Sequence, residues 1–328
     1  MRIYLSSGHK YPGWKYGVPS HSVHDLLAKG LAELGHEVRY HLKEGCETQL
    51  PEGVVPVSEV RGDEDILHIN HLPLEVERNP ILPWVHSVHS DLLYQGVARE
   101  KAKPNYIYVS QTLARIHQSD RYVWNGLDPA DFIYSETKSD YFLFVCAGDV
   151  HKALHVKGLD LAFRIASDSG VRLKVAGGTG GQDENARFGD LCRANGAIFL
   201  RMVHGKRKAE LFAGAKALLF PTQANEAFGL PIAEALVSGT PVIASDKGAI
   251  PELLDRRVGF ACSDESDYRA AVENLKRIAP IECRRVALER FHYLAMAQGY
   301  VAEYQKEIGS IQVPRTMAGG TTVNNELT

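Results

Sequence analysis

The sequence predicts an α/β protein built from two doubly wound, parallel-sheet domains that face a central cleft. Short apolar runs alternate with longer amphipathic segments along the chain, which is the pattern of parallel strands joined by helices. The alternation forms two series, separated by a polar stretch at residues 131–140 with few apolar side chains. The length of 328 residues fits two domains of ordinary size.

The first series opens on a buried-strand pattern at residues 2–6, followed by a polar loop and a helical pattern at residues 20–34. Gly35 suits the C-terminal end of that helix. The expected strands of this series are residues 2–6, 37–40, 65–69, 83–87 and 105–109. We therefore expect an N-terminal Rossmann-like domain over residues 1–135.

The second series repeats the alternation over residues 136–290, which we expect to form a second Rossmann-like domain. Its expected strands are residues 141–145, 171–176, 197–200, 217–220 and 241–244, and its expected helices are residues 159–167, 184–195, 206–214 and 231–238. A last helical stretch, residues 287–308, is rich in Phe and Tyr, and we expect its part at 291–309 to return to the first domain. The polar tail at 310–328 is expected to be disordered.

Composition excludes several classes of protein. The formal net charge of −3 gives no overall signature of nucleic-acid binding. The five cysteines are scattered without a Cys-x-x-Cys pair, which argues against a zinc site or a disulfide framework and favours reduced thiols in the cytoplasm. No apolar run is long enough for a signal peptide or a membrane span, so we expect a cytoplasmic protein. Peripheral contact with the inner face of a membrane stays open.

The most informative segment is residues 220–246. A strand pattern ends at Phe220, a loop follows, and Pro231 suits the first position of a helix. The backbone N–H groups of residues 228–230 would then lie at a helix N-terminus, where they bind anions. Glu226 lies in the loop and Glu234 in the expected first helical turn, so both would face the same opening beside the start of this helix.

Two carboxylates beside an anion site suit a ligand with hydroxyls on both sides of a phosphate group, as in a nucleotide-sugar. Without further evidence, the same residues also fit ordinary acids favoured by the dipole at a helix start. The pattern alone leaves both interpretations open.

The spacing of Glu226 and Glu234 resembles the Glu-x7-Glu motif of the retaining GT-B glycosyltransferases of family 4, the group 1 glycosyl transferases. Other segments resemble the same family. They are Phe228-Gly-Leu-Pro231, residues 238–244, Lys157-Gly158, Ala176-Gly-Gly178, Asn125-Gly-Leu-Asp128 and Val109-Ser110. The resemblance covers nearly the whole chain and is most specific at residues 217–254. It implies a GT-B fold and a hexosyltransferase that uses a UDP-, GDP- or ADP-linked sugar. It also implies that the domain at residues 136–290 binds this donor and that the domain at residues 1–135 holds the acceptor.

The resemblance also implies roles for individual residues. Glu234 would bind the ribose, and Glu226 would contact the transferred sugar near the reacting carbon. The turn Ala227-Phe228-Gly229-Leu230 would bind sugar hydroxyls and diphosphate through its amides, and Lys157 would neutralise the departing diphosphate. The family acts without a metal, and we expect no metal and no cofactor beyond the donor substrate.

Three further donor-site residues follow from the same resemblance. His89 matches the family's strand-end histidine, which reaches the donor sugar and the reaction centre. Val203 lies where the family holds the base, and Gly17 lies in a loop whose following helix would point at the donor phosphates. His86 is expected to face the interior of its strand.

One feature departs from the family, which usually has Gly-Arg directly after the first strand of the second domain. This chain continues Ala147-Gly148-Asp149, and Lys152, in a loop expected at residues 149–155, is the candidate replacement for the missing charge. The departure keeps a non-catalytic nucleotide-sugar binder or partner subunit open as an alternative, beside a sugar-nucleotide epimerase or phosphorylase of the same fold. A dehydrogenase is disfavoured, because residues 177–181 lack the helix and acidic residue of a dinucleotide site. The acceptor, a sugar, lipid or small molecule, and the oligomeric state stay undefined.

Overall fold

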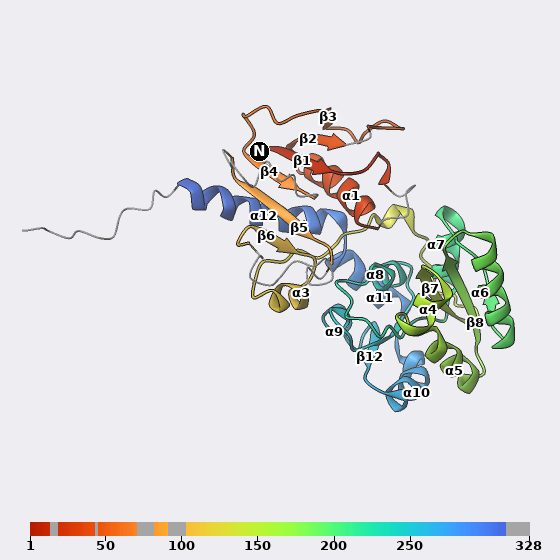
Figure 1. Cartoon of the computed structure of the whole chain (residues 1–328). Helices are drawn as coiled ribbons and strands as arrows, with labels where there is room; N and C mark the ends of the chain where they lie inside the picture. Colours follow the sequence, from red (N-terminus) through yellow and green to blue (C-terminus); the bar gives the residue numbers. More distant parts are fainter. Residues whose placement is uncertain (14–18, 43–44, 71–81, 91–102, 313–328) are drawn as a thin grey trace, which may run out of the picture.

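Two six-stranded parallel sheets form the framework of the protein in a computed structural model, which describes residues 1–13, 19–42, 45–70, 82–90 and 103–312 (Figure 1). The first sheet has the order β3-β2-β1-β4-β5-β6 and the second β12-β11-β10-β7-β8-β9. Both orders are the doubly wound order 3-2-1-4-5-6, so the predicted fold class is confirmed. Each order reverses at one pair of strands, β1 and β4 or β7 and β10, and ligands bind beyond the carboxyl ends of strands at such points.

The first sheet is covered on one side by α1 (Pro19–Glu33) and α12 (Tyr293–Gln312), which pack against each other (Figure 1). Its strands are β1 (Arg2–Ser7), β2 (Glu37–Leu42), β3 (Val54–Val57), β4 (Ile66–Ile69), β5 (Trp84–Val88) and β6 (Tyr106–Tyr108). The short helix α3 (Gln111–Ile116) follows β6. Sequence reasoning missed β3 because it is a short edge strand that contains Pro56, which only an edge tolerates.

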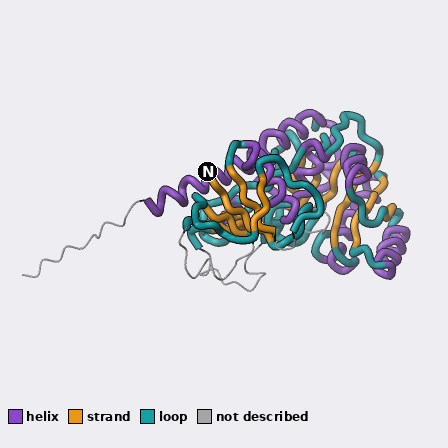
Figure 2. The backbone as a smooth tube through the Cα atoms, turned by 90° about the horizontal axis from the view of Figure 1, so that it is seen from above, coloured by secondary structure: helices purple, strands orange, loops and turns teal. Residues whose placement is uncertain are grey.

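The second sheet carries helices on both faces, and Figure 2 shows its strands as a group separate from those of the first sheet. Its strands are β7 (Tyr141–Ala147), β8 (Arg172–Gly178), β9 (Ile198–Phe199), β10 (Ala217–Phe220), β11 (Val242–Ser245) and β12 (Gly259–Cys262). Its helices are α4 (Val150–His155), α5 (Leu159–Ser169), α6 (Gln182–Ala194), α7 (Gly205–Gly214), α8 (Leu230–Val237), α9 (Ile250–Leu253), α10 (Glu265–Asn274) and α11 (Pro280–Arg290). Two 3-10 turns complete the set, η4 (Pro129–Asp131) and η5 (Leu275–Arg277).

Two expectations about helices were wrong. The loop expected at residues 149–155 contains α4, because the Asp149 carboxylate accepts from the Lys152 N–H and caps a helix. The single helical stretch expected at 287–308 is divided into α11 and α12 at Phe291 and His292. There the chain forms a bridge with Leu127 through two backbone hydrogen bonds of 2.8 and 3.0 Å.

The two crossings between the sheets therefore lie side by side, one outgoing near Leu127 and one returning at residues 291–293. From there α12 runs along the first sheet and extends to Gln312, three residues into the segment expected to be tail. Residues 313–328 lie outside the described residues. No helix in the described part of the chain has the length and apolar character needed to cross a membrane.

Candidate functional site

A lysine and a glutamate meet beyond the switch point of the second sheet. Lys157 follows β7 by way of α4, and Glu226 follows β10, the neighbour of β7 in the sheet. The Lys157 ammonium donates a short hydrogen bond to Glu226 Oε1, and the side chains are 21% and 16% exposed. The structure thus brings together two of the predicted site residues, 69 positions apart, at the edge where ligands bind in this fold.

The backbone around this pair is held by contacts between three loops. The Thr222 hydroxyl and the Gln223 N–H lie 3.0 and 2.8 Å from the Val156 carbonyl, which joins the loop after β10 to the loop after α4. The Ala249 N–H donates to the Glu226 carbonyl at 2.9 Å. Gly248 has φ of 60°, and a Cβ there would lie 2.4 Å from the backbone of Glu226, so no larger residue fits.

The start of α8 presents free backbone donors beside this pair. Gly229 is the N-cap, with φ of 100° and no side-chain cap. Within the described part of the chain, the N–H groups of Phe228, Gly229 and Leu230 have no recorded partner, as expected for an anion-binding helix start. Phe228 offers only its backbone, because its ring is buried edge-on against Phe291 at 5.8 Å.

The helix begins one residue earlier than expected, at Leu230, so Pro231 is the second helical residue. Glu234 is consequently the fifth residue and not part of the first turn, which contains no acid. The expectation about its turn was wrong because a left-handed Gly229 ends the loop directly before Leu230. Glu234 is therefore no first-turn acid of the kind that the helix dipole favours, which weakens that explanation of its presence.

Glu234 has a partner that sequence reasoning missed. The ammonium of Lys208, on α7, lies 2.6 Å from Glu234 Oε1. Lys208 belongs to the cationic run Lys206-Arg207-Lys208, and nothing in that run distinguishes the inward-facing member from the others. Only the packing of α7 beside α8 identifies it.

Lys152 lies on α4, and its side chain folds back over Gly148, where a Cβ would be 2.6 Å from the Lys152 Cδ. This contact brings Lys152 to the end of β7, where the family's arginine is absent. Burial raises the pKa of the Cys146 thiol there, Lys157 and Lys152 oppose that rise, and Asp149 and Glu226 add to it. Cations and carboxylates therefore lie together at the end of β7.

Val203 lies in the loop between β9 and α7, partly buried against the apolar cluster that includes Phe228 and Ala176. In the same loop the Arg201 carbonyl accepts from the Gly177 N–H at 2.9 Å, which ties the loop to the end of β8. Val203 is thus on the carboxyl edge of the second sheet, as expected for a residue near the base. The predicted Gly17 lies outside the described residues.

His89 lies one residue beyond β5 in the first domain, and its Nε2 is 3.2 Å from Nε2 of His24 on α1. His24 packs in turn against His68, which hydrogen-bonds to the hydroxyls of Tyr304 and Ser87 at 2.5 and 2.6 Å. Burial lowers the pKa of both His24 and His68 well below the usual 6.5, so both are neutral at pH 7. His89 therefore contacts the neutral, buried ring of His24 on α1.

His86 faces the strand interior, as expected, and its Nδ1 lies 2.7 Å from the Ile69 carbonyl. Despite the many histidines, the described residues contain no group of three or more His, Cys, Asp or Glu arranged to hold a metal ion. The five cysteines are all free, and four of them are buried.

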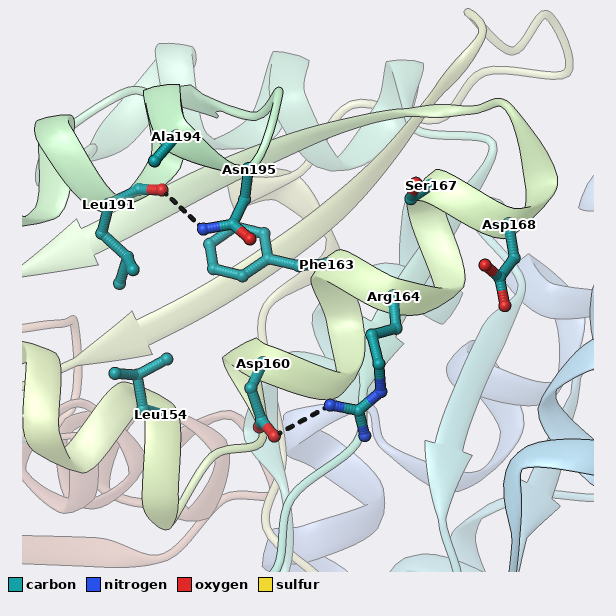
Figure 3. A pocket seen from close by; sticks show the side chains of 9 residues that line it. All are labelled: Leu154, Asp160, Phe163, Arg164, Ser167, Asp168, Leu191, Ala194 and Asn195. Atoms are coloured by element: carbon teal, nitrogen blue, oxygen red, sulfur yellow. Dashed lines mark hydrogen bonds and ion pairs between the residues drawn. The ribbon is translucent and has the colours of Figure 1, made fainter.

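An open groove of about 580 Å³ lies elsewhere on the second domain, between α5 and α6 (Figure 3). Its walls carry an Asp160–Arg164 pair at 3.2 Å and an Asn195 amide that donates to the Leu191 carbonyl at 2.9 Å. Arg164 and Asp168 also pair with Glu265 and Arg269 of α10, and no predicted site residue lines the groove. We assign it no role.

The two sheets, joined by a double crossing and carrying this site at the switch point, form a GT-B fold. Residues 132–290, just under half of the chain, match the family model described as Glycosyl transferases group 1.

Named relatives and a solved structure agree with this assignment. The chain is 29% identical to the O-antigen chain mannosyltransferase RfbU of Salmonella typhimurium, over 65% of this chain and 58% of that protein. It is 27% identical to the phosphatidyl-myo-inositol mannosyltransferase of Mycolicibacterium smegmatis, over 91% of this chain and 89% of that protein. AviGT4, a glycosyltransferase involved in avilamycin A biosynthesis, has a similar structure, with a TM-score of 0.73, 22% identity and coverage of 94% and 98%.

Proposed function

We propose that this protein transfers a hexosyl group from a nucleoside diphosphate sugar to an acceptor hydroxyl, with retention of configuration and without a metal. The observation that carries the proposal is the Lys157–Glu226 pair, which lies beside the free N–H groups of residues 228–230. Fixed donors and a cation suit a departing diphosphate, and a carboxylate suits the sugar hydroxyls.

In the proposed reaction the bond between the anomeric carbon and the diphosphate breaks as the acceptor oxygen forms its bond on the same face. The acceptor proton passes to the leaving phosphate oxygen, so a nucleoside diphosphate departs and no protein nucleophile is needed. Lys157 and Lys152 stabilise the developing charge, and Glu226 holds the sugar. In the ligand-free protein Lys157 neutralises Glu226, and the diphosphate would compete for its ammonium.

The first donor to test is GDP-mannose, because both named relatives are mannosyltransferases. Release of nucleoside diphosphate is measured with GDP-mannose, UDP-glucose and ADP-glucose, with mannosides, myo-inositol and a phosphatidylinositol vesicle as acceptors. Proton NMR of the product reports the anomeric configuration, and an excess of EDTA reports any need for a metal. An inverted product would overturn the same-face mechanism, and loss of activity in EDTA would overturn metal independence.

The alternative of a non-catalytic nucleotide-sugar binder predicts a different result. Such a protein would bind a donor tightly in calorimetry and release no nucleoside diphosphate with any acceptor. Lys157 and the free N–H groups of residues 228–230 favour the enzyme, because a leaving group needs more stabilisation of negative charge than a bound ground-state diphosphate.

A further inference from the structure

On α7, Lys208 differs from the neighbouring cations in the residue that its ammonium contacts. Lys206 is 84% exposed and lies 3.8 Å from Glu210 of its own helix. Lys208 instead reaches across to α8, where its ammonium lies 2.6 Å from Glu234 Oε1. It is 35% exposed, and its ammonium lies 5.8 Å from the centre of the buried Phe212 ring, so it is the partly buried member of the run.

Glu234 is oriented by this contact. Its side chain is 16% exposed, and a hydrogen bond from a charged donor holds a partly buried carboxylate in one conformation. Lys208 occupies Oε1, while no described residue donates to Oε2. Oε2 and the second lone pair of Oε1 are therefore open to hydroxyl donors from a ligand.

A second carboxylate also faces the ammonium of Lys208. The pKa of Asp131, in the η4 turn between the domains, is raised by burial and by Asp128, and Lys29 and Lys208 oppose that rise. Lys208 thus lies where the donor domain meets the linker, with Glu234 as its direct partner. Its removal would leave Glu234 without a cation among the described residues.

We propose that Lys208 is a positioning residue for the donor, which orients Glu234 so that this carboxylate accepts the ribose hydroxyls of the nucleotide. The inference rests on the proposed function, since it requires that a nucleoside diphosphate binds at this site. Lys208 acts through Glu234, so its effect depends on the ribose hydroxyls and not on the phosphates.

The test combines variants of the whole protein with nucleotides that lack one hydroxyl. GDP, UDP and ADP are compared by calorimetry, and the tightest is measured with its 2′-deoxy and 3′-deoxy forms. In the wild type we expect loss of the hydroxyl that Glu234 accepts to weaken binding about 10-fold, as for a hydrogen bond to a charged group. In Lys208→Met we expect the parent nucleotide to bind about 5-fold more weakly and that deoxy form to change less than 2-fold.

Two matched variants complete the design. Lys208→Arg keeps the charge and should restore most of the ribose dependence, whereas Lys206→Met removes an exposed cation from the same helix and should change neither affinity. Equal weakening of the parent and both deoxy nucleotides by Lys208→Met, or no weakening at all, would overturn the inference while leaving the proposed function intact. A wild type that binds none of the three nucleotides would overturn both.

Discussion

At the scale of single residues, the site consists of two carboxylates that each meet one lysine. Lys157 meets Glu226 and Lys208 meets Glu234, and all four side chains are partly buried. An ion pair in such a position is costly to break on one side only, because the remaining charge loses its partner. In each pair the two opposite charges neutralise each other in the ligand-free protein. Removal of one member therefore leaves the other charge unpaired.

Glu226→Ala should lower kcat about 100-fold or more and change donor affinity less, because a contact near the reacting carbon acts mainly in the transition state. Steady-state release of nucleoside diphosphate, together with calorimetry of the donor, measures both quantities. Glu210→Ala, an exposed glutamate on α7, is the control and should retain full activity. A Glu226→Ala enzyme with wild-type kcat would remove Glu226 from the reaction.

Lys152→Met should weaken nucleoside diphosphate binding about 5-fold without weakening the nucleoside, since the ammonium acts on the phosphates. The same variant should flatten the dependence of affinity on salt. Calorimetry with GDP and guanosine at two ionic strengths gives the comparison. If both ligands weaken equally, Lys152 does not replace the missing arginine.

At the scale of elements, the catalytic edge is built from loops that pack backbone against backbone. The loops after α4, β10 and β11 contact one another through Val156, Thr222, Glu226 and Ala249. Such contacts leave no room for side chains, which is why glycine stands where the loop after β11 meets the backbone of Glu226, at Gly248. The position of Glu226 therefore depends on Gly248, which has no side chain to take part in a reaction.

Gly248→Ala should destabilise the protein by about 2 kcal/mol and reduce activity, because the new Cβ adds a clash with Glu226 to the cost of a positive φ. Gly170→Ala is the matched control, since Gly170 has φ of 65° and nothing within 4 Å of the added Cβ. It should lose stability through backbone strain alone and keep its kcat. Thermal unfolding and kcat of both variants separate strain from the clash, and equal effects on kcat would contradict the explanation.

At the scale of the whole molecule, side-chain contacts hold the two domains together in addition to the two crossing segments. The carboxylate of Glu252 on α9 accepts from the N–H groups of Gln111 and Thr112 at 3.1 and 3.2 Å, so the second domain caps α3 of the first. Arg290 holds the carbonyl of Glu252 at 2.6 Å and lies 4.3 Å from the centre of the Trp124 ring. These contacts lie beside the double crossing and fix the domains there.

Glu252→Gln should loosen this junction, because a neutral amide caps a helix N-terminus less strongly than a carboxylate. We expect a loss of about 1 kcal/mol in stability and a larger radius of gyration in small-angle scattering of the ligand-free protein. Glu282→Gln, on the exposed face of α11, is the control and should change neither. An unchanged radius of gyration would mean that the crossing segments alone hold the domains together.

Much of this architecture was predictable because its signals are local. Alternating apolar runs gave the doubly wound class, and Glu226, Lys157 and the 228–230 turn follow strand ends whose positions the pattern predicted. The edge strands β3 and β12 were missed because one contains Pro56 and the other begins with Gly259, residue types that are rare in strands, and α4 was missed because it is a single short helix capped by Asp149. The predicted roles of individual site residues stay predictions until the variants above are measured.

By itself, the sequence determined the fold class and the pair of glutamates around the start of α8, since each depends on periodicity or on spacing within one segment. Only the tertiary structure decided which cation meets which carboxylate. The Lys157–Glu226 and Lys208–Glu234 pairs join residues 69 and 26 positions apart. The order of strands and the packing of α7 against α8 bring those side chains together, and no local pattern encodes such contacts.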